Sequence, residues 1–198
     1  MLEKHNLLAA KDVDAATGLD YVKSQVKKIY SALDNLKKTP DLPGPLFVYA
    51  HLLVPHPPYV FKPDGTADWT NYFDEHTGEM SSNVDKYQGY SNNVQFISRQ
   101  IIDVVDSLLE ANPNTVIIIQ GDHSSTYGNP YPILNVYYFP DRDYAFLYPD
   151  ISPVNSFRMV LNHFFHTEYP LLPDVHIAKD VNLPFWRGTV DPQMGECK

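Results

Sequence analysis

Two histidines and one Asp-His doublet are the residues of this sequence whose types and spacing could do chemistry. His51 and His56 lie in the stretch FVYAHLLVPHPPYVF, around the end of an apolar run. Asp122 and His123 follow a second apolar run, TVIIIQ, after Gly121, which would allow a sharp exit from a strand. A carboxylate and a neutral imidazole are ligands of Zn²⁺ or Mn²⁺. The doublet therefore predicts a metal site, and the histidine pair predicts a second ion or hydrogen bonds to an anionic oxygen.

The elements that must position these residues are two strands. Residues 46–53 and 115–120 are nearly continuous in apolar side chains, which is typical of strands buried on both faces of a parallel sheet. A helix with a three–four apolar rhythm spans residues 84–111 between them, so this unit predicts a right-handed crossover. Ligands of open α/β sheets bind outside the carboxyl ends of parallel strands. We therefore expect the histidine pair and the Asp-His doublet to share one rim.

The remaining pattern completes an α/β layer fold in a single domain. It predicts an amphipathic helix at 14–37, a third strand at 133–139 and a last helix from a capping serine, Ser152, to about Phe165. The segment 57–83 has no clear periodicity, but its aromatic residues favour an ordered flap. We expect the chain after the last helix to be irregular and wrapped on the surface. The aromatic residues of the flap are Tyr59, Phe61, Trp69, Tyr72 and Phe73.

Each candidate residue also has a purely structural interpretation. A histidine at a strand end is more often a satisfied structural residue than a ligand. An Asp-His pair after a strand is commonly a turn in which the aspartate accepts a backbone N–H. Four other histidines are interpreted as surface or packing residues: His76, His163, His166 and His176.

Composition narrows the range of partners. The formal net charge of −9 repels nucleic acid and anionic membrane surfaces. The single cysteine, Cys197, excludes an internal disulfide, and no run approaches the roughly 18 apolar residues of a membrane span. The sequence motifs of serine hydrolases, P-loop enzymes, dinucleotide-binding enzymes and HExxH metalloproteases are missing. We therefore expect a soluble chain that binds no nucleic acid and does not span a membrane.

The motifs occur in an order that resembles the order in a known family. FVYAHLLVPHPPYVF, then YQGYSNNVQFISRQIIDVVDSLL, then NTVIIIQGDHSS is similar to the C-terminal half of the sulfatase-like branch of the alkaline phosphatase superfamily. That branch includes sulfatases, lipoteichoic acid synthases and lipid A phosphoethanolamine transferases. The later PVNSFRMVLNHFF and YPLLPD are similar to the C-terminal stretch of bacterial membrane-anchored members. The resemblance covers the chain from about residue 40 to about residue 175.

The resemblance implies a metal-dependent hydrolase or transferase of phosphate or sulfate esters with a parallel-sheet α/β fold. Asp122 and His123 match the family's metal-binding Asp-His and would hold a divalent cation, which could be Zn, Mn or Ca. His51 and His56 are similar to the paired histidines of the transferases and would contact the substrate oxyanion or a second ion. The parent protein would be membrane-anchored with an extracytoplasmic domain.

This sequence departs from the family pattern in three places. The usual Asp-His-Gly is here Asp-His-Ser, and the family's later metal-binding histidine has no evident match. The family's nucleophile and first acidic ligand lie in an N-terminal half, whereas residues 1–45 here resemble a tail, an amphipathic helix and a linker. We therefore expect residues 46–198 to be the C-terminal region of a sulfatase-like domain, inactive alone. Its unpaired strand edges would favour a homo-oligomer.

Two other functions remain open at this point. The first is a non-catalytic module that uses the rim histidines to bind an anion or a partner, with the aromatic flap as its contact surface. The second is a metallophosphoesterase of another fold, in which a strand also runs into Gly-Asp-His. That fold would require further His, Asn and Asp ligand motifs, which the sequence does not show.

Overall fold

The structure is a computed structural model in which two compact units are distinguished. The units are Met1–Pro113 and Asn114–Lys198. Within them, the structure describes residues 18–69, 85–123, 133–174, 177–179 and 188–190.

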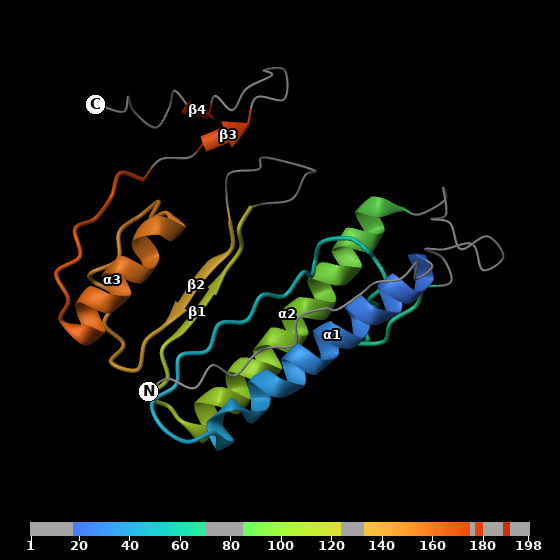
Figure 1. The fold of residues 1–198 in the computed structure, drawn as a ribbon, viewed down its shortest axis with the longest axis horizontal. Helices are drawn as coiled ribbons and strands as arrows, with labels where there is room; N and C mark the ends of the chain where they lie inside the picture. The colour runs from blue at the N-terminus through green and yellow to red at the C-terminus, as the bar shows by residue number, and fades with distance from the viewer. Residues whose placement is uncertain (1–17, 70–84, 124–132, 175–176, 180–187, 191–198) are drawn as a thin grey trace. The chain divides into compact units, whose positions relative to one another are not determined.

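Two long helices form the frame of the first unit. They are α1, Gly18–Lys38, followed by the short 3₁₀ helix η1, Thr39–Asp41, and α2, Lys86–Ala111. α1 and α2 pack side by side and run in the same direction (Figure 1). Both helices confirm the prediction from the sequence periodicity. An amphipathic stripe is a local signal, and burying it needs only one apolar partner. The buried stripe of α1 consists of Val22, Val26, Ile29 and Leu33.

Aromatic side chains lock the loop before α2 onto this helix pair. The rings of Phe61 and Phe96 are stacked with centroids 4.1 Å apart and planes 5° apart. Tyr30 of α1 meets both rings edge-on, and its hydroxyl donates a hydrogen bond of 2.6 Å to the carbonyl of Gly65. The described part of the predicted flap is therefore packed on the helices. Its last two aromatic residues, Tyr72 and Phe73, lie outside the described residues.

The prediction of a strand at residues 46–53 is wrong. These residues have no regular secondary structure, and Phe47 and Tyr49 are 81% and 75% exposed. A strand exists only where a neighbour takes up its backbone hydrogen bonds. Among the described residues of the first unit, no strand lies beside this segment. The apolar run of the sequence is therefore real, but it is not buried here.

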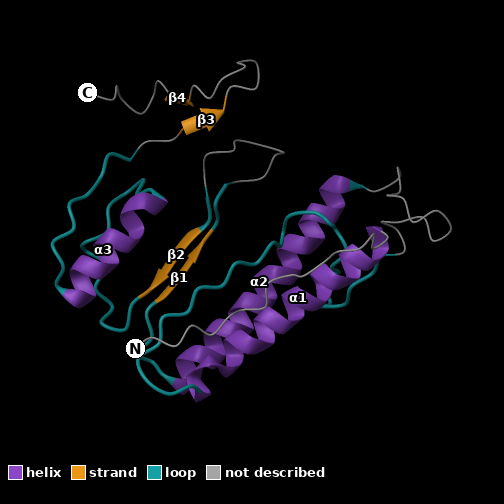
Figure 2. Cartoon of the chain, viewed as in Figure 1, coloured by secondary structure: helices purple, strands orange, loops and turns teal. Residues whose placement is uncertain are grey.

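A two-stranded sheet and one helix form the frame of the second unit (Figure 2). β1, Ile117–Gln120, pairs antiparallel with β2, Asn135–Tyr138, and Ile117 faces Tyr138 in the register. α3 spans Pro153–Phe165. These elements confirm the strands predicted at 115–120 and 133–139 and the last helix. The chain after α3 was expected to be irregular, but it also contains the short antiparallel pair β3, Ile177–Lys179, and β4, Gly188–Val190.

The start of α3 is held differently from the prediction. Ser152 is the N-cap residue, but its side chain accepts no capping hydrogen bond. Instead, the carboxylate of Asp174 accepts the Ser152 N–H at 2.8 Å and also the Ser152 hydroxyl. Asp174 lies beyond the end of the helix in sequence, so the chain that follows α3 returns to cap the helix start. A carboxylate at a helix N-terminus is favourable because it complements the helix dipole.

The parallel sheet of the predicted fold is not shown. Both strand pairs among the described residues are antiparallel. Because residues 46–53 form no strand, the right-handed crossover predicted between that segment and residues 115–120 is not formed in this structure. The domain boundary predicted at residue 45 stays a prediction. Within the part of the chain that is described, no helix has the length and apolar character needed to cross a membrane.

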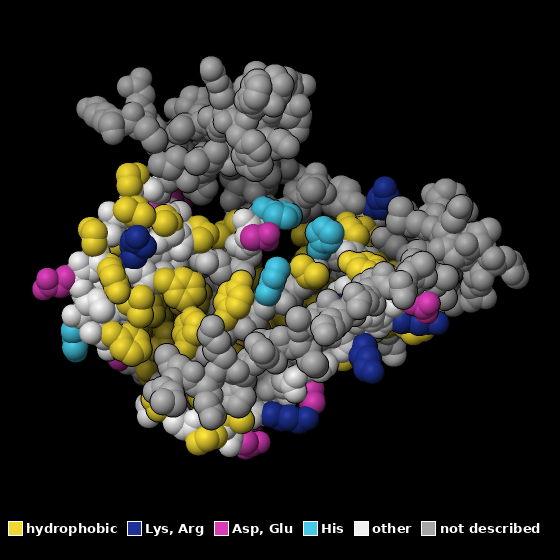
Figure 3. All heavy atoms as spheres, viewed as in Figure 1, with side chains coloured by type: hydrophobic (Ala, Val, Ile, Leu, Met, Phe, Trp, Pro, Cys, Tyr) yellow, Lys and Arg dark blue, Asp and Glu magenta, His cyan; other side chains and the backbone are white. Residues whose placement is uncertain are grey.

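The surface of the second unit carries many apolar side chains. Val154, Phe157 and Phe165 of α3 are 42%, 41% and 69% exposed. Figure 3 shows such side chains in yellow over the unit that contains α3. A helix with apolar residues on its outer side normally has a further layer against it.

Candidate functional site

The Asp-His doublet lies directly after β1. The Asp122 Oδ2 and His123 Nε2 atoms are 3.7 Å apart, and their side chains are 86% and 58% exposed. The Asp122 Oδ1 atom accepts the backbone N–H of His123 at 3.0 Å. The structural interpretation of this pair, an aspartate that binds a turn N–H, is therefore correct as far as it goes. The same bond leaves Oδ2 and the imidazole side by side.

Buried polar contacts hold the end of β1 in place. The side-chain amide of Gln120 donates hydrogen bonds of 3.0 Å to both Asn135 Oδ1 and Ser156 Oγ. Ser156 of α3 is fully buried and also bonds the Tyr137 hydroxyl at 2.7 Å. The residue before Gly121 is thus tied to β2 and to α3 together. Gln120 could not be found from the sequence, because a single polar residue at the end of an apolar strand carries no distinct signal.

Gly121 is not needed for the backbone conformation. Its N–H continues the ladder by donating to Leu134 O at 2.9 Å. A Cβ atom at this position would meet no atom closer than 3.7 Å, which is an ordinary van der Waals distance. The expected role of this glycine in a sharp exit from the strand is therefore not supported.

The histidine pair lies in the first unit, and both side chains are exposed. The His56 Nδ1 atom is 2.8 Å from the carbonyl oxygen of Pro57. Because a carbonyl oxygen only accepts hydrogen bonds, Nδ1 must carry a proton. In the neutral ring this leaves Nε2 with its lone pair, the state in which histidine binds a metal or accepts a proton. His51 lies in the segment before it, outside any helix or strand.

A second buried residue, Asn93 of α2, contacts the loop that carries His56. Its side-chain amide bonds the backbone of that loop at four places. The sequence contains a weak signal for it, since Asn93 lies between Tyr90 and Val94 on the apolar stripe of the helix. A polar residue on an apolar stripe must find a partner when it is buried.

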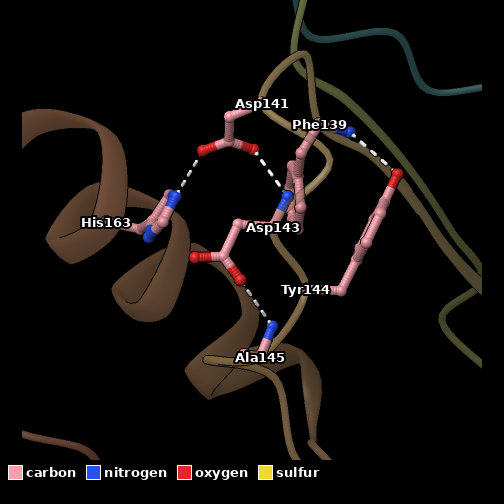
Figure 4. A network of polar contacts seen from close by, with 6 residues as sticks. All are labelled: Phe139, Asp141, Asp143, Tyr144, Ala145 and His163. Atoms are coloured by element: carbon pink, nitrogen blue, oxygen red, sulfur yellow. Dashed lines mark hydrogen bonds and ion pairs between the residues drawn. The ribbon is translucent and has the colours of Figure 1, made fainter.

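His163 is a packing residue, as expected, and it also makes a short polar contact (Figure 4). Its ring stacks on Phe146 with centroids 4.1 Å apart, and its Nε2 atom lies 2.6 Å from Asp141 Oδ2. The hydrogen bond from His163 holds the pKa of the Asp141 carboxyl below its usual value. Of the other histidines, His166 is the C-cap of α3, at a φ of 53°. His76 and His176 lie outside the described residues.

The sequence model of one family covers more than half of this chain. It is the sulfatase family, and it matches residues 17–150. The chain belongs to the sulfatase family. The matched range includes both the histidine pair and the Asp-His doublet. None of the curated proteins and none of the solved structures compared with the chain matches it. The sulfatase family acts on sulfate esters and generally uses a divalent metal.

The Asp-His doublet fits part of such a metal site. The carboxylate and imidazole of Asp122 and His123 are chemically suitable ligands at a mutual distance that one ion can bridge. Among the described residues, no cluster of three or more His, Cys, Asp or Glu side chains could hold an ion. The doublet therefore offers two ligands. The shared rim with His51 and His56 stays a prediction, because each unit is determined by itself.

Proposed function

We propose that this chain provides the metal ligands and the anion contacts of a sulfatase-family enzyme that acts on sulfate or phosphate esters. Asp122 and His123 hold the divalent cation, and His51 and His56 contact the charged oxygens of the ester. The observation that supports this most is the side-by-side arrangement of the Asp122 carboxylate and the His123 imidazole at the end of β1, within the range that matches the family. The metal, when bound, would polarise the ester oxygen as a Lewis acid.

The proposed roles follow the charges of the side chains, with the carboxylate at the cation and the imidazole at the anionic oxygens. Asp122 provides an anionic oxygen whose partner oxygen is already held by a backbone N–H, so the carboxylate is partly oriented before an ion arrives. His56 has a proton at Nδ1 and, once its ring is protonated, a second N–H at Nε2 for an anionic oxygen. A carboxylate binds the metal cation and a protonated imidazole binds the ester oxygens, so each charge meets one of opposite sign.

The chain by itself is proposed to bind rather than to turn over. Its sequence contains no recognisable sulfatase-family nucleophile, so we expect no ester cleavage by this chain alone. The resemblance of its later segments supports the membrane-anchored branch of transferases and an extracytoplasmic location for the working protein. A non-catalytic anion-binding module is the second candidate, and the absence of a recognisable nucleophile motif favours it.

Metal binding tests the role of the doublet. Mn²⁺ added to the isotope-labelled chain should broaden the NMR signals of Asp122 and His123, and calorimetry with Zn²⁺ should report one site. Asp122→Asn should weaken that site by about 10- to 100-fold, because a neutral amide replaces an anionic ligand. Glu168→Gln removes an exposed carboxylate elsewhere in the same unit and is the matched control. Equal affinity in both variants would exclude the proposed metal ligand.

The same NMR spectra test whether the two residue pairs share one rim, and a hydrolysis assay tests whether the chain cleaves esters. Broadening of His51 and His56 by Mn²⁺ is expected if both pairs share one rim, and unchanged signals would contradict that arrangement. Aryl sulfate and aryl phosphate with Mn²⁺ or Zn²⁺ should show no hydrolysis above the Asp122→Asn background. Hydrolysis that disappears in Asp122→Asn would show that the chain is a complete enzyme and would contradict the proposal that it only binds.

A further inference from the structure

We propose that Asn93 of α2 positions His56 for its ligand. This inference rests on the proposed function, because it concerns the same histidine. Asn93 is fully buried, lies 37 residues from His56 in the sequence, and makes its hydrogen bonds to the backbone of the histidine's loop. It is therefore a positioning residue and not a catalytic one.

One side-chain amide bonds the loop on both sides of the histidine. The Asn93 Nδ2 group lies 3.4 Å from Pro55 O, 3.5 Å from His56 O and 3.2 Å from Pro58 O. Its Oδ1 atom accepts the N–H of Phe61 at 3.2 Å. Both faces of the amide, donor and acceptor, are thus used. The bonded groups span the turn from residue 55 to residue 61, so the amide fixes the turn as a whole.

The carbonyl that orients the His56 ring lies inside this clamped turn. Pro57 O accepts the Nδ1 proton, and the residues on either side of Pro57 give their carbonyls to Asn93. A shift of the turn would therefore move the acceptor away from Nδ1. Without that acceptor the neutral ring could carry its proton on either nitrogen. The clamp thus keeps Nδ1 at Pro57 O and leaves Nε2 as the nitrogen that donates to an anionic oxygen once the ring is protonated.

The α2 surface is shaped to receive the turn at a second point. Gly89 lies one helical turn before Asn93, on the same face. A Cβ atom at Gly89 would lie 2.5 Å from Tyr59 Cβ, so only glycine allows the loop to approach the helix this closely. Gly89 and Asn93 therefore act on the same loop by different means, one by leaving space and one by hydrogen bonding.

Other residue types at position 93 could not make the same set of contacts. An apolar side chain would leave three carbonyls and the Phe61 N–H without this partner, and buried polar groups are costly to leave unpaired. Aspartate would keep the acceptor for Phe61 but would lose both donors. Asn93→Asp therefore separates the contact to Phe61 from the contacts to the carbonyls around His56.

The experiment compares Asn93→Asp with Asn92→Asp in the full chain. Asn92 is the neighbouring asparagine, and its Oδ1 accepts the Gln88 amide at 2.8 Å on the exposed side of α2. Long-range ¹H–¹⁵N NMR spectra report which His56 nitrogen is protonated. The chain as it stands and Asn92→Asp should both show the Nδ1–H form. Asn93→Asp should show a mixture of the two forms in the neutral ring. With the ring protonated, its affinity for inorganic phosphate, read from the His56 signals, should be about tenfold weaker, because Nε2 is no longer held in one direction.

Two outcomes would overturn the proposal. If folded Asn93→Asp gives the same His56 spectrum and phosphate affinity as Asn92→Asp, the clamp does not act on the ring. Asn93→Ser, which is neutral and smaller, serves as the second variant if the aspartate prevents folding. If neither variant folds, Asn93 is a core determinant without a separate positioning role, and the proposal is also wrong. A chain whose His56 ignores phosphate in every form would instead contradict the proposed function, while the protonation pattern still decides the role of Asn93.

Discussion

At the scale of single residues, three of the described side chains are polar and have no exposed surface: Asn93, Asn155 and Ser156. Each bonds a segment distant in sequence. Asn155, for example, donates to Leu172 O at 2.7 Å and accepts the Leu172 N–H at 2.9 Å. A fully satisfied buried amide fixes both the distance and the direction of its partner, which an apolar contact does not. Buried amides therefore hold the loop around residues 55–61 and, together with the Asp174 carboxylate, the chain that follows α3.

The close approach of Tyr59 to α2 gives a prediction for Gly89→Ala. Alanine favours a helix over glycine by about 1 kcal/mol, so in an open position it would stabilise α2. Here the added Cβ atom would meet Tyr59 Cβ at 2.5 Å, and overpacking of this kind costs about 1–3 kcal/mol. We expect the free energy of unfolding to fall by about 1 kcal/mol, measured by urea denaturation.

Gly121→Ala is the matched control for this effect. The nearest atom to its added Cβ lies at 3.7 Å, and the Gly121 φ angle is not in the left-handed region. Its stability should change by less than about 0.5 kcal/mol, the usual range for a substitution that creates no clash. Equal losses of unfolding free energy in the two variants would show that the clash with Tyr59 is not the cause of the destabilisation.

The residue types of the candidate site could be predicted from the sequence, but their supports could not. His51, His56, Asp122 and His123 lie in or directly after apolar runs, where imidazoles and carboxylates are candidates for metal and anion binding as well as for turn and packing contacts. Asn93 is an ordinary residue until the backbone of a distant loop lies beside it. What a buried amide contributes to the structure depends on hydrogen-bond partners that are brought to it only when the chain folds.

At the scale of elements, the difference between helices and strands explains what the sequence could predict. α1, α2 and α3 form from contacts within each helix plus one apolar partner, so their periodicity was sufficient. β1 and β2 follow each other along the chain and pair antiparallel. The run at 46–53 has equal β propensity but needs a non-local partner, and propensity alone does not provide one.

The start of α3 gives a prediction with a defined pH dependence. Burial alone would raise the pKa of Asp174, but hydrogen bonds from Ser152 and Tyr148 outweigh it and hold the pKa below its usual value. A lowered pKa in the folded state means that ionised Asp174 stabilises the fold above the ordinary aspartate pKa of about 3.9. This stabilisation is lost as the pH falls through that value toward the lower pKa of the folded state.

Asp174→Asn should therefore destabilise α3 mainly near neutral pH. We expect a loss of about 1–3 kcal/mol at about pH 7, from weaker hydrogen bonds to Ser152 and Tyr148, and a smaller loss at about pH 3. Hydrogen exchange of the α3 amides measures both. Asp150→Asn, at an exposed aspartate nearby, controls for removal of a charge. A loss that does not change with pH would show that the charge of Asp174 is not the cause.

At the scale of the whole molecule, apolar surface is exposed in both units. Phe47 and Tyr49 of the first unit are among the most exposed apolar side chains described, and α3 of the second unit carries exposed Phe157 and Phe165. Patches of this kind usually mark surfaces that meet another layer or another chain. The parallel sheet predicted from the sequence would use residues 46–53 as one of its strands, and a second copy of the chain could supply the missing partner.

Self-association through this segment is the prediction that follows. An unpaired apolar run with high β propensity pairs readily with another edge, so the chain should form homo-oligomers whose weight-average mass rises with concentration. Replacing both Phe47 and Tyr49 by serine removes apolar area from the contact and should raise the dissociation constant by at least about tenfold, or about 1.4 kcal/mol. Tyr21→Ser, at a tyrosine of α1 that is 53% exposed, is the control and should leave the constant unchanged. Sedimentation velocity over a hundredfold concentration range measures all three proteins. A single monomeric species throughout for the unmodified chain would contradict the prediction, and equal association of the double variant would place the contact elsewhere on the surface.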